Sequence, residues 1–300
     1  MVCNISATFD LILTKSIGKS MNLYTIDTGF FKLDGGAMFG VVPKSIWQNL
    51  NPPDENNLCT WAMRCLLIEN KDRLILIDNG IGNKQGTKFM SYYYLHGDDT
   101  LDRSLAKHGF CSDDITDVFL THLHFDHCGG SIIREGEKLK PAFKNAIYWS
   151  NQSHWDWAIT PNDREKASFL KENILPIQDS GQLQFLPMED GITFADTMTI
   201  RFAYGHTEAM MIPQISYKNQ TLLYMADLLP ATMHIPIPYV MAYDMFPLQT
   251  LKEKKHFLEE AFTKKYILFF EHDPKVECCT LQQTEKGIRL AEKFKLAELD

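Results

Sequence analysis

The stretch that most constrains the fold is HLHFDHCGG, residues 122–130, which follows the apolar segment TDVFLT. It places three histidines and an aspartate within six consecutive positions. On a β-strand, side chains two residues apart share a face, so His122, His124 and Asp126 are expected to point together where a strand ends. The pattern predicts a strand that delivers metal-binding side chains to the edge of a sheet.

His127 has the opposite parity, so the loop after the strand has to turn it towards the same place. Gly129 and Gly130 tolerate backbone angles that other residues avoid, and they allow close packing of the following chain. One short segment can then serve two neighbouring metal ions. His122 and His124 are expected to bind the first ion, and Asp126 and His127 the second.

Zinc takes about four nitrogen, oxygen or sulfur ligands, so this segment leaves both sites incomplete. Three later residues qualify, each at the end of a predicted strand: His206 in YGHTEAM, Asp227 in YMADLL and His272 in FFEHD. His206 is expected to complete the first site and His272 the second, with Asp227 bridging the two. A single histidine at a strand end is usually structural, but seven such positions are costly to bury without a cation.

Strand and helix signals alternate along the chain without a repeat or a flexible linker, so we expect one domain over residues 1–300. The early part is rich in strands, and four strands finish beside candidate ligands. This order predicts two sheets covered by helices. Helical patterns are expected in KFMSYYYL, TLDRSLAKHG, NDREKASFLKENI, LQTLKEKKHFLEEAFTK and the C-terminal LQQTEKGIRLAEKFKLAEL.

Charge and composition restrict the classes of partner that the chain is expected to bind. A net charge of −8 disfavours nucleic acid, whose binding depends on clustered Lys and Arg. No run of about 18 apolar residues suggests a membrane span, and residues 1–20 lack the pattern of a secretory signal. The seven cysteines contain no CxxC pair, so they are expected to be reduced thiols of a cytoplasmic protein.

HLHFDH followed by GHT, by an Asp after an apolar strand and by a late His resembles the metallo-β-lactamase superfamily, over almost the whole chain. The resemblance implies an α+β fold, a four-layer αβ/βα sandwich with the metals at one edge between the sheets. It also implies the ligand set His122, His124, Asp126, His127, His206, Asp227 and His272. With Asp227 and not a cysteine at the bridging place, the sequence resembles the branch of N-acyl-homoserine lactonases and methyl-parathion-type hydrolases.

The resemblance implies a dinuclear hydrolase that cleaves a lactone or carboxylic ester by attack of a metal-bridging hydroxide. Asp126 is the candidate catalytic residue, carrying the proton to the leaving oxygen. Zinc is the expected metal, and iron, manganese and cobalt suit the same ligands. The alternatives are a glyoxalase-II-like thioesterase, a phosphotriester hydrolase and a binding protein that keeps its metals for stability.

The thioesterase would need basic residues late in the chain, and Lys286, Arg289, Lys293 and Lys295 are available, although their predicted helical spacing is typical of a solvated face.

TGFFKLDGGAMFGVVPKSIW raises the question of a substrate pocket. Its glycines, Gly35, Gly36 and Gly40, predict a loop. The apolar side chains of this loop either line a pocket for an acyl chain or pack the first hairpin. They are Met38, Phe39, Val41 and Val42.

One departure concerns the position three residues beyond the bridging Asp227, where some lactonases have a tyrosine that contacts the substrate carbonyl. This chain has Pro230 there. The donor would then be His234, Tyr239 or Tyr243, or the metal alone would polarise the carbonyl.

Four further features carry open roles. His154 either packs or supports the site, and Asp78 either forms a turn or orients a ligating histidine. Cys128 is expected to pack. The aromatic MSYYYLHG stretch is a candidate surface for a homodimer, and the expected substrate is a small molecule.

Overall fold

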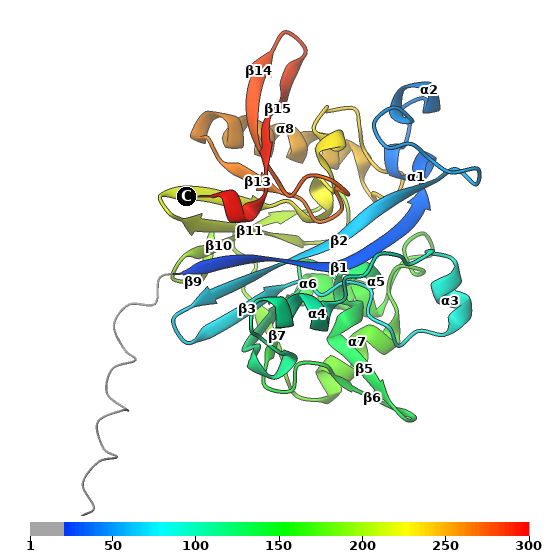
Figure 1. Ribbon diagram of the computed structural model, residues 1–300, viewed down its shortest axis with the longest axis vertical. Helices are drawn as coiled ribbons and strands as arrows, with labels where there is room; N and C mark the ends of the chain where they lie inside the picture. Colours follow the sequence, from blue (N-terminus) through cyan, green and yellow to red (C-terminus); the bar gives the residue numbers. More distant parts are fainter. Residues whose placement is uncertain (1–20, 300) are drawn as a thin grey trace, which may run out of the picture.

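The computed structural model describes residues 21–299, in which two β-sheets face each other and helices cover their outer faces (Figure 1). This arrangement agrees with the predicted α+β sandwich of four layers. Cys3 and the expected absence of a targeting segment in residues 1–20 lie outside the described residues. The assignment of residues 1–300 to one domain stays a prediction.

The first sheet has six strands. β1, β2 and β3 pair antiparallel, and β3, β4, β7 and β8 pair parallel. In spatial order the strands are β1 (Asn22–Asp34), β2 (Leu58–Asn70), β3 (Arg73–Ile77), β4 (Asp117–Phe119), β7 (Ile147–Asn151) and β8 (Leu183–Leu186).

The second sheet has seven strands, all paired antiparallel except the neighbours β12 and β13. Its spatial order is β15 (Gly287–Phe294), β14 (Cys278–Thr284), β13 (Ile267–Phe269), β12 (Gln220–Tyr224), β11 (Met210–Tyr217), β10 (Met198–Ala203) and β9 (Ile192–Ala195). A small hairpin of β5 (Ile132–Glu135) and β6 (Lys138–Pro141) stands apart from both sheets.

The longer helices form the two outer layers. α4 (Leu101–Lys107), α6 (Gln152–Ile159) and α7 (Lys171–Asp179) cover the first sheet, and α8 (Pro247–Lys264) covers the second. Within residues 21–299, none of the helices combines the length and apolarity that crossing a bilayer requires. The short helices are α1 (Gly35–Phe39), α2 (Lys44–Trp47), α3 (Thr87–Ser91) and α5 (Phe125–Cys128), and the 3-10 turns are η1 (Ser112–Asp114), η2 (Gly129–Ser131), η3 (Ala226–Leu228), η4 (Thr232–His234) and η5 (Leu296–Glu298).

Strand β2 explains why the sandwich has a core on both sides of its first sheet. Leu66 and Ile68 point into the cluster between the sheets, whereas Cys65 and Leu67 point into the cluster under the helices. Alternate residues therefore bury both faces, which accounts for the nearly continuous apolar run in this strand.

The predicted C-terminal helix is wrong. Residues 278–294 form the β14–β15 hairpin, whose turn reverses at Gly287 with φ +88°. Cys278 and Cys279 pair with β13 and are buried, so this segment extends the sheet at its edge. Sheet pairing outweighs a local preference for helix, which is a weak determinant of structure.

The predicted helix over NDREKASFLKENI is correct only in its last part, because α7 begins at Lys171. Residues before it form turns, and the side chain of Glu165 is directed to Nε2 of His124 at 2.9 Å. A contact far away in the sequence therefore sets the local conformation here.

The glycine pair after the histidine motif is needed for close approach and not for unusual backbone angles. Gly129 has φ −61°, which any residue adopts. A Cβ at Gly129 would lie 2.1 Å from the carbonyl oxygen of Ile81, and one at Gly130 would lie 2.2 Å from that of Asn79. The loop after β3 thus lies directly against the loop after β4, and this contact fixes the position of the motif.

Gly129→Ala is expected to destabilise the protein by at least ~1–3 kcal/mol, because the new methyl group would overlap the backbone of Ile81, which can move only by distorting the loop after β3. Urea unfolding of the metal-free protein measures the effect. Gly86→Ala is the matched control, since no heavy atom lies within 4 Å of a Cβ built there. Equal stability of Gly129→Ala and Gly86→Ala would contradict the close-approach explanation.

Candidate metal centre

The histidine motif leaves the first sheet earlier than the sequence predicted. β4 ends at Phe119, so the expected strand parity of the motif is wrong. His124 has extended backbone angles and caps α5, whose first turn carries Asp126 and His127. The helix turn, and not a strand, presents these two side chains to the same place.

All seven predicted residues are nevertheless brought together, and each is buried, with at most 8% of its surface exposed. They form two groups of ligand atoms at the edge of the sandwich. The first group is His122, His124, His206 and Asp227, and the second is Asp126, His127 and His272. Their role as metal ligands stays a prediction, which the geometry of each group can test.

The first group has the dimensions of a tetrahedral zinc site. Nδ1 of His124 lies 3.1 Å from Nε2 of His122 and 3.2 Å from Nε2 of His206. Oδ2 of Asp227 lies 3.1 Å from Nε2 of His206 and 3.8 Å from Nε2 of His122. Four donors around zinc, with bonds of about 2.0–2.1 Å, would be about 3.3 Å apart.

The second group has similar dimensions. Nε2 of His272 lies 3.1 Å from Nε2 of His127 and 3.2 Å from Oδ1 of Asp227. Oδ2 of Asp126 is 3.9 Å from the His127 nitrogen and 3.8 Å from the His272 nitrogen. Asp227 therefore directs one oxygen to each group, as expected of a bridging carboxylate.

The outer ring nitrogen of each imidazole contacts an oxygen, which fixes the tautomer. A ring that donates its outer N–H to oxygen presents a lone pair on the inner nitrogen. Five lone pairs then converge on one buried space, and they repel one another unless cations lie between them. The outer partners are Thr121 Oγ1 for His122, Glu165 Oε1 for His124, Asp78 Oδ2 and Glu271 Oε2 for His127, Asp244 Oδ1 for His206 and the Ala62 carbonyl for His272.

Beside the carboxylates of Asp227 and Asp244, the electrostatic field also favours cations. Burial opposes charge on His206, but Asp227 and Asp244 raise its pKa to about 10. In the same way Asp227 raises the pKa of His272 to about 9 against the effect of burial. Oδ1 of Asp227 is buried and has no hydrogen-bond partner among residues 21–299. The donor set therefore fits divalent metal ions, which would take the place of the protons.

Two residues whose roles the sequence left open support the motif. His154 is fully buried, and its Nε2 accepts a hydrogen bond from the backbone N–H of Leu123 at 2.8 Å. Asp78 has φ +56° and accepts hydrogen bonds from both the N–H and the hydroxyl of Thr121. Asp78 thus both forms the turn and orients ring nitrogens. Cys128 packs as expected, buried under the motif.

Sequence reasoning missed three supporting carboxylates. Glu165 lies in a segment predicted as helix, and Asp244 lies in a loop without a motif. Glu271 is next to His272 in the sequence, which was the only available signal. Burial alone would raise the pKa of Glu165, but hydrogen bonds with His124, Thr207 and Trp157 lower it to about 2, so it is a charged acceptor.

The glycine-rich stretch expected as a loop contains helix α1, with Gly35 packed against the ring of Trp47. Met38 and Phe39 are buried in a cluster that includes Phe125 of the motif helix, whereas Val41 is 90% exposed. Val42 is buried in the same cluster, so packing accounts for three of the four apolar residues, and Val41 is left for other contacts.

The structure distinguishes the three candidate hydrogen-bond donors that were expected to act in place of the tyrosine found in some lactonases. His234 is fully buried, with Nε2 2.9 Å from the carbonyl oxygen of Met38. Tyr239 packs edge-on against Phe39. Tyr243 precedes Asp244, the partner of His206, and after burial the nearby carboxylates, Asp126 among them, raise the pKa of its phenol. The carbonyl oxygen of Pro230 accepts a hydrogen bond from the backbone N–H of His272, with a donor–acceptor distance of 3.0 Å.

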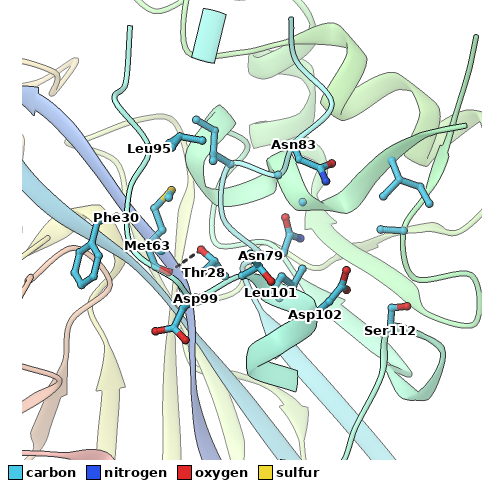
Figure 2. Close-up of a pocket in the computed structure, with 18 of the residues that line it drawn as sticks. Thr28, Phe30, Met63, Asn79, Asn83, Leu95, Asp99, Leu101, Asp102 and Ser112 are labelled. Carbon is cyan, nitrogen blue, oxygen red and sulfur yellow. Dashed lines mark hydrogen bonds between the residues drawn. The ribbon is translucent and has the colours of Figure 1, made fainter. Parts of the chain in front are cut away.

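A separate cavity of about 390 Å³ lies beside the centre, between β1, α4 and the loop after β3 (Figure 2). None of the seven residues lines it. Asn79 is in its wall, and the N–H of Asn79 donates to the carbonyl of His127 at 2.9 Å. The cavity therefore adjoins the centre through one layer of backbone but is not the place where the ligand atoms meet.

Comparison with known proteins identifies the class. The model of the metallo-beta-lactamase superfamily matches residues 64–279, so the chain belongs to this superfamily of hydrolases. The predicted family, fold and enzyme class, a metal-dependent hydrolase, are confirmed at this level.

Individual relatives are distant but cover most of the chain. An N-acyl homoserine lactonase of Bacillus thuringiensis is 23% identical over 266 residues, which cover 84% of this chain and 92% of the relative. The structure of a probable metal-dependent hydrolase from Staphylococcus aureus is 27% identical, covers 94% of this chain and 99% of its own, and has a TM-score of 0.83. AidC, a dizinc quorum-quenching lactonase in complex with a product, is 24% identical with a TM-score of 0.75, covering 93% of this chain and 97% of its own.

Metal analysis of the purified protein is expected to find about two divalent ions per chain. Removing them with a chelator should lower the thermal unfolding midpoint, because ions that bind only the folded state stabilise it by mass action. Returning Zn²⁺ should restore the midpoint. Fewer than one ion per chain, with no shift on adding Zn²⁺, would contradict the metal centre.

Proposed function

We propose that the protein is a dinuclear metal-dependent hydrolase that cleaves a lactone or carboxylic ester of a small molecule. The observation that carries the proposal is the convergence of five imidazole lone pairs and two carboxylates on two tetrahedral groups joined by Asp227. These two groups would hold two divalent ions, most simply zinc, which would supply Lewis-acid polarisation of a substrate carbonyl and lower the pKa of bound water.

The residues of the chain hold and orient these groups and manage the proton. Of the two carboxylates among the seven residues, Asp126 is the slightly more exposed, with 12% of its side chain accessible against 9% for Asp227, so we assign the proton-carrying role to Asp126. Asp126 lies on the first turn of α5, and its carboxylate would take the proton from the attacking water and pass it to the leaving oxygen.

Apolar and phenolic groups border the centre on the side of Asp126. Phe125 packs against Tyr93, whose ring centroid is 4.6 Å away, and burial, with a smaller contribution from the charge of Asp126, raises the pKa of Tyr93 to about 12. Leu170 and Met233 lie against the same cluster. This surface suits a substrate with an apolar acyl part, in agreement with the lactonase names of the relatives.

The thioesterase alternative loses its structural support. Lys286, Arg289, Lys293 and Lys295 belong to the β14–β15 hairpin and the residue after it, at the outer edge of the second sheet (Figure 1). They do not form the predicted helix. A thioester or phosphotriester remains an outcome of the substrate test below.

Asp126→Asn is expected to lower kcat by roughly 100-fold or more on the best substrate, because the amide cannot carry the proton. The assay compares chromogenic esters, lactones, thioesters and phosphotriesters with zinc-loaded protein. Asp163→Asn is the matched control, since the Asp163 side chain is 99% exposed. Equal rates in Asp126→Asn and the parent would exclude catalysis at this centre, and preference for thioesters or phosphotriesters would replace the proposed substrate class.

Tyr243→Phe is expected to lower kcat/KM by up to roughly 100-fold while leaving the metal content at the parent level, if its phenol donates to the substrate carbonyl. Tyr239→Phe should change little, because Tyr239 packs against Phe39. Steady-state kinetics of the two variants test this assignment. A larger loss in Tyr239→Phe than in Tyr243→Phe would reverse it.

A further inference from the structure

Glu271 is a buried carboxylate that the proposed reaction does not use. It follows β13, directly before His272, and none of its surface is exposed. Its Oε2 lies 3.0 Å from Nδ1 of His127. Neither of its oxygens accepts a well-aligned hydrogen bond from any donor within residues 21–299. No Lys or Arg of that range forms an ion pair with it, so the ionised form of Glu271 would have the ring of His127 as its cation partner within that range.

His127 differs in this respect from the other four imidazoles. Each of those has one oxygen at its outer nitrogen, whereas Nδ1 of His127 faces two carboxylates, Glu271 and Asp78, the latter at 3.2 Å. Asp78 already accepts two hydrogen bonds from Thr121, which hold it in place. A ring whose inner nitrogen binds a metal has a single N–H to donate. One carboxylate is therefore enough to orient the ring, and the second has to be explained by its charge.

A buried charge without a partner is costly, and a cation nearby removes that cost. A metal ion in the second group would lie on the far side of the His127 ring from Glu271. Carboxylates behind a ligating imidazole also make its inner nitrogen a stronger donor. Both effects act on the second group, which contains His127, and not on the first, whose rings have their own acceptors.

We infer that Glu271 is a positioning residue that strengthens metal binding by the second group, formed by Asp126, His127, His272 and the shared Asp227. The inference rests on the metal centre of the proposed function and concerns how that centre is filled. In this view the second charge on His127 lets the second group compete with the first, which has one imidazole more. The chain would then hold two ions even where free metal is scarce.

The test is a titration of metal-free protein with Zn²⁺ against a chromogenic chelator. Glu271→Gln keeps the size and an acceptor oxygen but removes the charge. It is expected to weaken binding of one of the two ions by about 10–100-fold and to leave the other unchanged. Glu165→Gln is the matched control: it removes a buried charge that contacts His124 of the first group, so it should not weaken binding by the second group.

Two backgrounds assign the effect to a group. In His206→Ala the first group is impaired, and Glu271→Gln should still weaken the remaining ion. In His272→Ala the second group is impaired, and Glu271→Gln should have no further effect, as expected when two residues act on the same site. An equal effect in both backgrounds, or no effect in either, would overturn the inference.

Folding and charge are controlled separately. The far-ultraviolet circular dichroism of metal-free Glu271→Gln should match that of the parent. Glu271→Asp keeps the charge and should retain more of the affinity than Glu271→Gln, and an equal loss in both would overturn a role for the charge. The titration uses no substrate, so a failure to hydrolyse lactones would leave this result intact, whereas a parent protein that binds no Zn²⁺ would refute the proposed function itself.

Discussion

The repulsion among five imidazole lone pairs around one aspartate is the constraint on which the rest of the structure depends. Each outer nitrogen is held by an oxygen of the surrounding chain, so the lone pairs of the inner nitrogens face one another. This arrangement is unfavourable unless cations lie between the rings. Those oxygens come from the segments after β3, β4 and β13, the segment before α7, the loop before α8 and the backbone of β2. The packing of both sheets thus holds the five imidazole rings close together in spite of the repulsion between their lone pairs.

The sequence was sufficient to single out the seven residues that the fold brings together, because they are polar groups at the ends of apolar segments, and such groups have few structural uses there. It was also sufficient for the central strands, whose apolar runs are long. It misplaced the end of β4, since the apolar run continues to Leu120, one residue beyond the end of the strand. It mistook the β14–β15 hairpin for a helix, because pairing with β13 depends on residues that precede it in the chain.

The carboxylates that hold the imidazoles were harder to predict. Glu165 and Asp244 have no spacing rule that links them to His124 and His206, and only the folded chain brings them within 2.9 and 2.8 Å. The residues that would contact the substrate were hard to predict for the same reason. Pro230 removed one expected phenol, but which other phenol lies near Asp126 depends on how the loop between β12 and α8 folds back over the centre.

The seven residues are spread from position 122 to position 272, and Asp227 joins two groups that include side chains from both halves of the chain. Contacts so distant in sequence close large loops, and such contacts form late and slowly when a protein folds. The centre therefore cannot be assembled until the two sheets have docked. An ion held by both groups would therefore bind only to a chain whose two sheets have docked, so its binding would be coupled to the last long-range contacts of folding.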